Sequence, residues 1–477
     1  MENNEIITGK TRYKDIDFTF VFDGFELRLI PPEDKEHTIG WDWKMKEIEK
    51  GRYTFAEPMH IEEPYLVGEC NEKYHRIVFL PEVGSYIATR NYIVIIQIKG
   101  YIVFTSDQRI SKMSVSCPEL NYIYPTNQLV TYELNTEGFS SNGVIGITTK
   151  DFDSTKTDKT EFVVDDRKIE VYFSINRTVS SKNNRAPIVA ESVLIFTFEQ
   201  TDDYDFLYQL WTIAQNFIRF LCYRKDVYIP SVMLSAIQDN DKYQECATLY
   251  VCNQDEPSDL EILEKGRYIK QIYISGYEGK ILSDIANYRL YMRHIPESYD
   301  AGREIDAARF VMITAAFEWE FKRAYPKGIT KSSRTTEAEN QVDKEISNCI
   351  EHSKGKKKEI YKFLKKLIRS NSLASEITQI GKDYANIVNI FGIQKYSWNH
   401  QKLDYTKMGE RLSKQRNNFA HGNLEQDFIG NSLLDLIFLE NVIYAIQLKQ
   451  YGIDDICIQK AINDLFGCHI AIKEHTD

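Results

Sequence analysis

The sequence is poor in the features that mark metal-binding, secreted and membrane-spanning proteins. Its eight cysteines include no CxxC pair, and the closest two are Cys246 and Cys252. Because a zinc site needs clustered ligands, we expect reduced and mostly buried thiols, with no metal and no cofactor. No run of about 18 apolar residues could span a membrane, and the polar start Met1-Glu2-Asn3-Asn4-Glu5 is unlike a secretory signal. The sequence therefore predicts a cytoplasmic protein without a membrane segment.

Basic residues are outnumbered, because 59 Lys and Arg face 70 Asp and Glu, a formal charge of −11. This balance argues against a general nucleic-acid coat protein. Residues 354–369 are the exception: they carry eight basic side chains and one acidic, a net of +7, so the rest of the chain sums to −18. Their apolar residues have helical spacing, which predicts a basic helix. A solvated helix face is one interpretation; the other is a contact to RNA phosphates through Lys356, Lys357, Lys358, Lys365 and Lys366.

The first 200 residues show the two-residue alternation of β-strands. Apolar side chains at Ile16, Phe18, Phe20 and Phe22 are followed by Asp23-Gly24 and a second alternating run, which is a strong hairpin signal. Further strands are predicted at residues 92–98, 101–105, 143–148, 169–175 and 192–199. Many short strands between turn-rich segments indicate a sandwich or barrel.

Beyond residue 201 the apolar residues recur at helical spacing. A helix is predicted near residues 203–224 with Asp202 or Asp203 as its N-cap, then a strand at 247–252. Later helices are predicted at 280–292, 304–324, 338–349, 356–368, 405–418, 432–448 and 458–466, with a mobile loop at 327–337. The predicted fold class is α+β: a β-rich, sandwich- or barrel-like domain at 1–275 and an all-α helical-bundle domain at 276–477.

One segment near the end combines residues suited to phosphate chemistry. In Arg416-Asn417-Asn418-Phe419-Ala420-His421-Gly422, a polar residue follows the arginine and a histidine comes five residues after it. The segment lies between two predicted helices. The same spacing recurs at Arg289 and His294, but there an apolar leucine follows the arginine within an ordinary amphipathic pattern. We interpret that second copy as structural.

This segment resembles the HEPN superfamily, whose ribonucleases share an Arg-x4–6-His motif with a polar residue often after the arginine. A β-rich first half, with stretches such as residues 51–55 through Glu69, followed by a helical domain further resembles the ApeA-like HEPN proteins of bacterial anti-phage defence. The resemblance implies metal-independent RNA cleavage, a homodimer through the helical domain and a role in abortive infection. It makes structured cellular RNA, with tRNA as one candidate, the expected substrate. A phage-derived trigger would act through the N-terminal domain.

The chemistry can be argued from the side chains as well. RNA carries its own nucleophile, the 2′-hydroxyl. Histidine titrates near neutral pH, so His421 can act as general acid or base, while the Arg416 guanidinium fits the scissile phosphate. Asn417 is expected to position the phosphate or His421. The expected products are a 2′,3′-cyclic phosphate and a 5′-hydroxyl.

Two further expectations concern the surroundings of the motif. Five residues along a helix leave Arg416 and His421 about 140° apart, and a two-fold dimer would bring two copies of each to one cleft. Glu318 could orient Arg416 or His421 from a neighbouring helix, or else form a surface pair with Lys322 or Arg323.

Two other functions stay open at this point. One is a non-catalytic HEPN-type module that binds RNA or protein. The other is a carbohydrate- or peptide-binding β-sandwich with a helical dimerisation tail.

Overall fold

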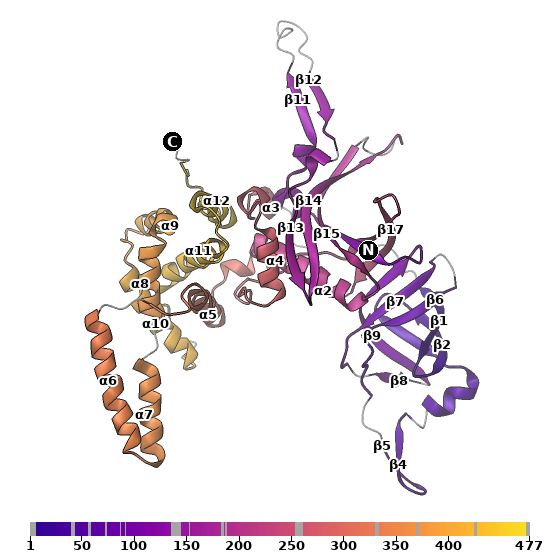
Figure 1. Ribbon diagram of the computed structural model, residues 1–477, viewed down its shortest axis with the longest axis horizontal. Helices are drawn as coiled ribbons and strands as arrows, with labels where there is room; N and C mark the ends of the chain where they lie inside the picture. The colour runs from indigo at the N-terminus through magenta and orange to yellow at the C-terminus, as the bar shows by residue number, and fades with distance from the viewer. Residues whose placement is uncertain are drawn as a thin grey trace. The chain divides into compact units, whose positions relative to one another are not determined.

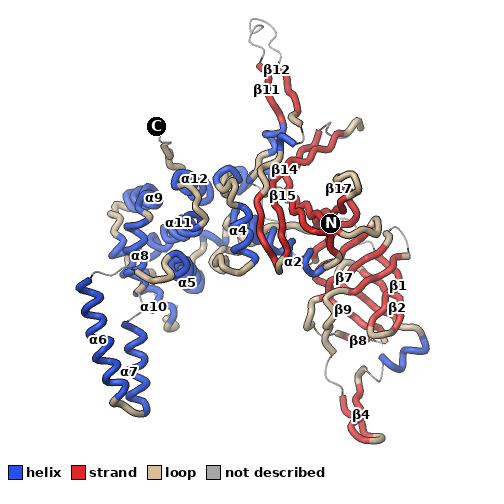
Figure 2. The backbone as a smooth tube through the Cα atoms, in the orientation of Figure 1, coloured by secondary structure: helices blue, strands red, loops and turns tan. Residues whose placement is uncertain are grey.

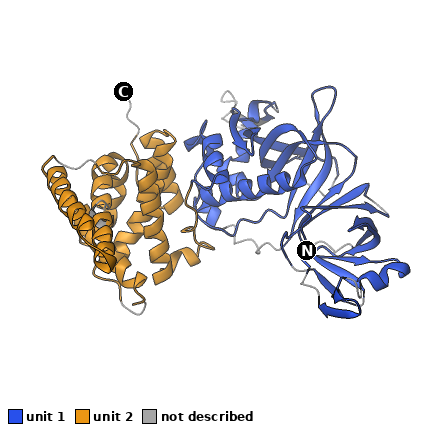
Figure 3. Ribbon diagram, turned by 60° about the horizontal axis from the view of Figure 1, so that its bottom comes forward, with its two compact units in different colours: residues 1–289 blue, residues 290–477 orange. Residues whose placement is uncertain are grey.

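The structure is a computed structural model that describes residues 6–473 apart from positions 40–42, 56–58, 72–73, 86, 91, 135–144, 152, 183–185, 187, 253–260, 330–332, 369–371 and 424–426. The chain divides into two compact units, residues 1–289 and 290–477, which Figure 3 shows in different colours. The described strands all belong to the first unit, and the second is helical (Figure 2). The predicted α+β class, β-rich first and helical second, is confirmed at this level.

A six-stranded antiparallel barrel opens the first unit. The strands follow the order β9-β3-β2-β1-β6-β7, and β7 pairs with β9 again, which closes the ring. Their bounds are β1 (Ile7–Tyr13), β2 (Ile16–Phe22), β3 (Glu26–Ile30), β6 (Leu66–Cys70), β7 (Arg76–Pro81) and β9 (Ile93–Phe104). The apolar positions of the alternating runs point inward, so Phe20, Phe22, Leu29 and Phe79 are buried together. Alternation along each strand thus separates the barrel core from its surface.

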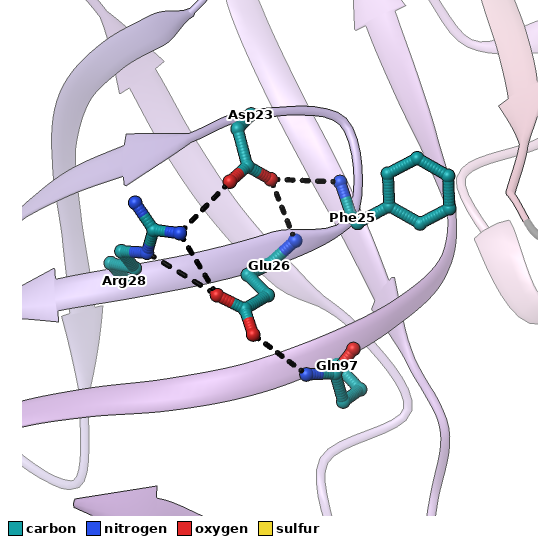
Figure 4. A network of polar contacts seen from close by, with 5 residues as sticks. All are labelled: Asp23, Phe25, Glu26, Arg28 and Gln97. Atoms are coloured by element: carbon teal, nitrogen blue, oxygen red, sulfur yellow. Dashed lines mark hydrogen bonds and ion pairs between the residues drawn. The ribbon is translucent and has the colours of Figure 1, made fainter. Parts of the chain in front are cut away.

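The predicted hairpin between β2 and β3 is confirmed, and Figure 4 shows its turn. One carboxylate oxygen of Asp23 accepts hydrogen bonds from the backbone amides of Phe25 (3.1 Å) and Glu26 (3.0 Å). Between these residues Gly24 takes a φ of +97°, which favours glycine. The guanidinium of Arg28 bridges Asp23 and Glu26, so the turn is fixed by residues adjacent in sequence.

Strand β9 is shared between the barrel and an extended sheet. Its second half pairs with β7 on one side and with β17 on the other. The sheet then continues through β17 (Tyr243–Val251), β16 (Ser231–Ile237), β10 (Ile110–Ser116), β15 (Ile188–Thr201), β14 (Arg167–Val179) and β13 (Thr160–Val164). The sequence suggested two strands, at 92–98 and 101–105, where the structure has one. Gly100, which looked like a turn residue, lies within β9, where an added Cβ would be 2.9 Å from the Tyr250 carbonyl oxygen.

Over its described part, the first unit has two helices longer than one turn, α2 and α4. The predicted helix near 203–224 is α2 (Tyr204–Cys222), and the Asp203 side chain caps it by accepting from the Phe206 amide. α4 (Glu278–Ala286) contacts β13, β14 and α2, so it belongs to the first unit, and the units divide after Arg289 rather than at the expected 275. The remaining elements are β4 (Met45–Glu49), β5 (Arg52–Phe55), β8 (Ala88–Arg90), α1 (Leu120–Ile123), β11 (Val130–Leu134), β12 (Ile145–Thr149) and α3 (Glu261–Glu264).

The second unit consists of helices, labelled in Figure 1. They are α5 (Ala307–Ala324), α6 (Ser333–Glu351), α7 (Gly355–Ile368), α8 (Leu373–Asp383), α9 (Ala385–Trp398), α10 (Tyr405–Ala420), α11 (Ser432–Gln450) and α12 (Asp455–Phe466). α11 contacts α5, α9, α10 and α12, so it is the central helix. Its side chains are buried nearly all round, which accounts for a sequence without a clear polar face.

Several boundaries differ from the sequence predictions. The helix predicted at 280–292 ends at Ala286, where α4 stops. The loop predicted at 327–337 was wrong from Ser333 onward, because α6 begins there; residues 330–332 lie outside the described part. α8 and α9 were missed, since both are short and only a single residue separates them. Residues 143 and 144 of the strand predicted at 143–148 also lie outside the described part.

The carboxylate of Asp435 joins three helices of the second unit. Asp435, on α11, has a fully buried side chain. It accepts two hydrogen bonds from the Arg411 guanidinium of α10, at 2.7 and 2.8 Å, and one from the Tyr396 hydroxyl of α9. Burial and the neighbouring Asp435 carboxylate both raise the pKa of Tyr396, so this phenol stays protonated and donates. The contact fixes α10, and with it the Arg416–His421 segment, against the core.

We expect Asp435→Asn to destabilise the second unit by about 3–5 kcal/mol, because Arg411 would lose its buried counter-charge. Urea unfolding followed by far-UV circular dichroism measures this loss. The matched control is Asp455→Asn, which breaks the partly exposed Lys449–Asp455 pair at 2.6 Å and is expected to change the unfolding free energy by less than ~1 kcal/mol. Equal effects of the two substitutions would contradict the role given to Asp435.

Candidate functional site

Helix α10 carries the Arg416–His421 segment. It begins after Asp404, whose side chain accepts hydrogen bonds from the amides of Thr406 and Lys407. Met408, Leu412, Gln415 and Phe419 follow at three- and four-residue steps and form its buried face. This face packs on α5, α8 and α11. The residues of α10 that lie between these buried positions are therefore at the edge of the helix–helix contacts.

A glycine ends α10 directly after the histidine. The amide of Gly422 donates to the Phe419 carbonyl and the amide of Asn423 donates to the Asn418 carbonyl, both over 3.1 Å. Gly422 has a φ of +86°, so this is the Schellman arrangement in which glycine is preferred. His421 is therefore the C-cap residue of α10, exposed to solvent.

Arg416 turns toward α5 and Glu318. Its guanidinium donates to a Glu318 carboxylate oxygen over 3.2 Å, and the two side chains are 36% and 23% exposed. Asn417 and His421 are exposed. The structure thus brings Arg416 and Glu318 together, while the next carboxylate of α5, Glu320, pairs with Arg323 at 2.9 Å.

A second carboxyl group, Glu376 on α8, lies in the same charged cluster. It is only 5% exposed. Burial, together with the Glu318 carboxylate and against the attraction of Lys322, raises the pKa of Glu376 to about 7. The cluster of Arg416, Glu318, Lys322 and Glu376 therefore draws on three helices, α10, α5 and α8, and contains a carboxyl group that exchanges its proton near neutral pH.

Sequence reasoning missed Glu376 because it missed α8. The available signal was a serine cap followed by apolar residues at helical spacing. The Ser372 hydroxyl accepts from the Ser375 amide at 3.2 Å, and Leu373, Ile377 and Ile380 are buried. Even a correct helix assignment would not have brought Glu376 near Glu318, since the two are far apart in the chain.

The predicted RNA-contacting lysines lie on α7, within a hairpin formed with α6. Lys356, Lys357 and Lys366 are exposed, and Lys358 is half-buried. Lys365 differs, because its ammonium contacts the Ser347 hydroxyl at 2.6 Å and the Asp343 carboxylate at 3.4 Å on α6. This lysine helps to hold the hairpin together, and the basic surface is made by the other lysines.

The second Arg-x4-His copy has a different setting. His294 is 3% exposed. Arg289 forms an ion pair with Asp284 at 2.7 Å, five residues before it in the chain. A buried histidine and an arginine that is paired with Asp284 of α4 do not form an accessible phosphate site.

Two features are absent from the described part of the chain. No group of three or more His, Cys, Asp or Glu residues that could hold a metal ion occurs there. Within that same part, none of the helices combines the length and apolar character required to cross a bilayer.

No family model matches the chain, and no curated protein or solved structure matches it significantly.

The arrangement at the end of α10 suits binding of a phosphate. An ion pair between partly exposed side chains contributes only about 0–1 kcal/mol, so Arg416 can exchange Glu318 for a phosphodiester at little cost. His421 lies five residues further along, exposed at the C-cap of α10. The segment combines an anion-binding group with an accessible group for proton transfer.

We expect Glu376→Gln to stabilise the protein at pH 8 by about 3 kcal/mol and to have little effect at pH 5. Glutamate ordinarily titrates near 4.5, and the folded-state pKa of Glu376 is about 7. The folded state therefore holds the proton over this interval and loses stability as pH rises through it. Urea unfolding of both forms at pH 5 and pH 8 measures the difference.

The control for this experiment is Glu410→Gln, on the exposed side of α10. It should give the same unfolding free energy as the unmodified chain at both pH values. A Glu376→Gln effect that is equal at pH 5 and pH 8 would show that this carboxyl group does not titrate between them.

Proposed function

We propose that this protein is a metal-independent endoribonuclease of the HEPN type, which cleaves cellular RNA by attack of the 2′-hydroxyl. The observation that carries the proposal is the end of α10, where Arg416 and the exposed His421 are held by a glycine-terminated helix within an all-helical unit. The sequence motif around them resembles that of HEPN ribonucleases.

The proposed roles follow from the side-chain chemistry. Arg416 leaves Glu318 and binds the scissile phosphate through its planar guanidinium. His421 transfers the proton of the 2′-hydroxyl or of the leaving 5′-oxygen. Asn417, exposed between them in sequence, positions the phosphate. Glu318 holds Arg416 in place when no substrate is bound.

A homodimer completes the proposed mechanism. One histidine does not serve easily as both acid and base in a single step, and a two-fold axis near the end of α10 would supply a second His421 and a second Arg416. In this proposal the protein acts in the cytoplasm in abortive infection, and the β-rich unit recognises a phage-derived trigger. Structured RNA such as tRNA is the proposed substrate.

A non-catalytic HEPN-type module that binds RNA or protein is the second candidate. The Arg416–Glu318 ion pair favours it, because an arginine engaged by a carboxylate is also found in purely structural contacts. The two candidates differ in whether RNA is cut, so a cleavage assay separates them.

We expect the purified protein to cleave total cellular RNA in the presence of EDTA, and His421→Ala and Arg416→Ala each to lower the rate by ~10² or more. The products should carry 2′,3′-cyclic phosphate and 5′-hydroxyl ends, detected by end-labelling before and after phosphatase treatment. Arg289→Ala, in the second Arg-x4-His copy, is the matched control and should cleave normally. Cleavage that survives in both site variants would assign the activity to a contaminant or another site, and no cleavage would favour the binding module.

We also expect the lysines of α7 to contact the RNA backbone. Replacing Lys356, Lys357 and Lys358 by alanine should reduce the slope of log affinity against log salt concentration by about 2, since each phosphate contact contributes roughly 0.7–0.9. RNA binding by the non-cleaving His421→Ala form, measured from low to moderate salt, gives this slope. The control replaces three exposed lysines of the first unit, Lys10, Lys46 and Lys242. An unchanged slope in the α7 variant would rule out this contact.

A further inference from the structure

A polar groove lies between α8 and α10, which pack side by side in the second unit (Figure 1). Its volume is about 380 Å³. Apart from Ile329 and Ala374, the side chains that line it are polar: Ser375, Thr378, Gln379, Lys382, Thr406 and Glu410. Such a lining suits a polar ligand that makes several hydrogen bonds.

Two glycines set the helices close together. At Gly409 of α10, an added Cβ would lie 2.7 Å from the Cα of Ala374 on α8. At Gly381 of α8, an added Cβ would lie 2.3 Å from the ring of Tyr405 on α10. An early residue of α8 is thus beside Gly409 and a late one beside Tyr405, so the two helices run in opposite directions.

The polar residues of α8 come from one side of that helix. Ser375, Thr378, Gln379 and Lys382 recur at three- and four-residue steps, and the stripe from the first to the last is about 10 Å long. Because the helices are antiparallel, the Lys382 end lies toward the start of α10. The Ser375 end lies toward the half of α10 that carries the Arg416–His421 motif.

Glu410 connects the groove to this motif. Asn417 and His421 follow Glu410 by seven and eleven residues, so both lie within about 20° of it around the helix axis. Asn417 is about 10 Å further along α10. A strand bound at the motif therefore meets the groove when it continues along the same side of α10.

The groove offers mainly hydrogen-bond acceptors. The Thr378 hydroxyl donates to the Ala374 carbonyl at 2.9 Å, so its oxygen is left to accept. The Gln379 amide nitrogen donates to the Asp383 carboxylate at 2.9 Å, which leaves the Gln379 carbonyl oxygen for a ligand. Glu410 adds a carboxylate with two accepting oxygens. A ligand in this groove must therefore donate hydrogen bonds.

We propose that the groove between α8 and α10 is a nucleotide-binding site for single-stranded RNA, which selects a base whose Watson–Crick edge donates hydrogen bonds. Guanine fits best, because its N1–H and N2–H₂ groups donate side by side to the two oxygens of Glu410. Uracil fits worst, because its two carbonyl oxygens would face acceptors. Lys382, at the other end of the groove, binds a neighbouring phosphate.

The site takes an unpaired base, as loops of structured RNA present it. The inference rests on the proposed function in one respect, that the ligand is the RNA strand held at Arg416. Binding and cleavage can be measured separately, so the two proposals can fail independently.

The first test measures RNA binding by the full-length, non-cleaving His421→Ala form. One probe is a short oligouridine, and the other is the same oligomer with one central guanosine. The guanosine should tighten binding about fivefold or more, which is the lower end of what a bidentate contact to one base discriminates. Fluorescence anisotropy gives both dissociation constants. Equal affinity for the two RNAs, or no binding of either, would overturn the proposal.

Two substitutions in the same form assign the roles within the groove. Glu410→Gln should remove most of the guanosine preference, because a glutamine side chain has only one accepting oxygen. Lys382→Ala should weaken both RNAs to the same extent, because a phosphate contact carries no sequence information. The matched controls Glu304→Gln and Lys473→Ala, at exposed positions outside the groove lining, should change neither quantity. A guanosine preference that survives Glu410→Gln with unchanged circular dichroism would overturn the proposal.

Mapping of cut sites separates this proposal from the proposed cleavage. Sequencing of the RNA ends left by the unmodified protein should show guanosine enriched at a fixed distance from the cut, and Glu410→Gln should lose this enrichment. Cleavage without any such enrichment would overturn the groove proposal and leave the nuclease proposal standing. Guanosine binding that depends on Glu410, in a protein that does not cut RNA, would support the groove and overturn the nuclease.

Discussion

The second unit depends on one buried carboxylate. Asp435 accepts hydrogen bonds from Arg411 on α10 and from Tyr396 on α9, and it is itself part of the central helix α11. A charge in the interior is tolerated only when it is paired and hydrogen-bonded, so three helices must keep their register around it. Arg416, five residues beyond Arg411 on α10, takes its position from this contact. Any chemistry at Arg416 and His421 therefore depends on a buried contact that is separate from these two residues.

The charged cluster beside α10 shows how a weak and a strong electrostatic effect combine. The Arg416–Glu318 pair is partly exposed and costs little to open. Glu376, in contrast, is buried next to Glu318, and both effects raise its pKa to about 7. A group that titrates near neutral pH one helix away from an arginine is a common feature of reactive sites. The proposed cleavage needs Arg416 to be available, and the exposed ion pair allows it.

The hairpin illustrates a limit of helical periodicity. Ile360, Phe363 and Leu364 have the spacing of a core-facing stripe, yet all three are exposed. Periodicity records that a helix has an apolar side, and it does not say what lies against that side. In the proposed function, the exposed lysines of α7 are the groups that contact RNA.

Local patterns in the sequence determined the β-rich first part, the Asp23–Gly24 turn, the Asp203-capped α2 and the helices that flank the Arg416–His421 motif, because each depends on neighbouring residues. Closure of the barrel, the single strand β9 and the burial of Glu376 were decided by tertiary structure. Gly100 looks like a turn until the Tyr250 carbonyl is seen to occupy the space of a side chain. The Arg416–Glu318 pair likewise joins residues separated by 98 positions. Short-range hydrogen bonds and periodicity depend on residues close together in the sequence, so the sequence predicts them. Long-range contacts depend on which surfaces the folded chain brings together.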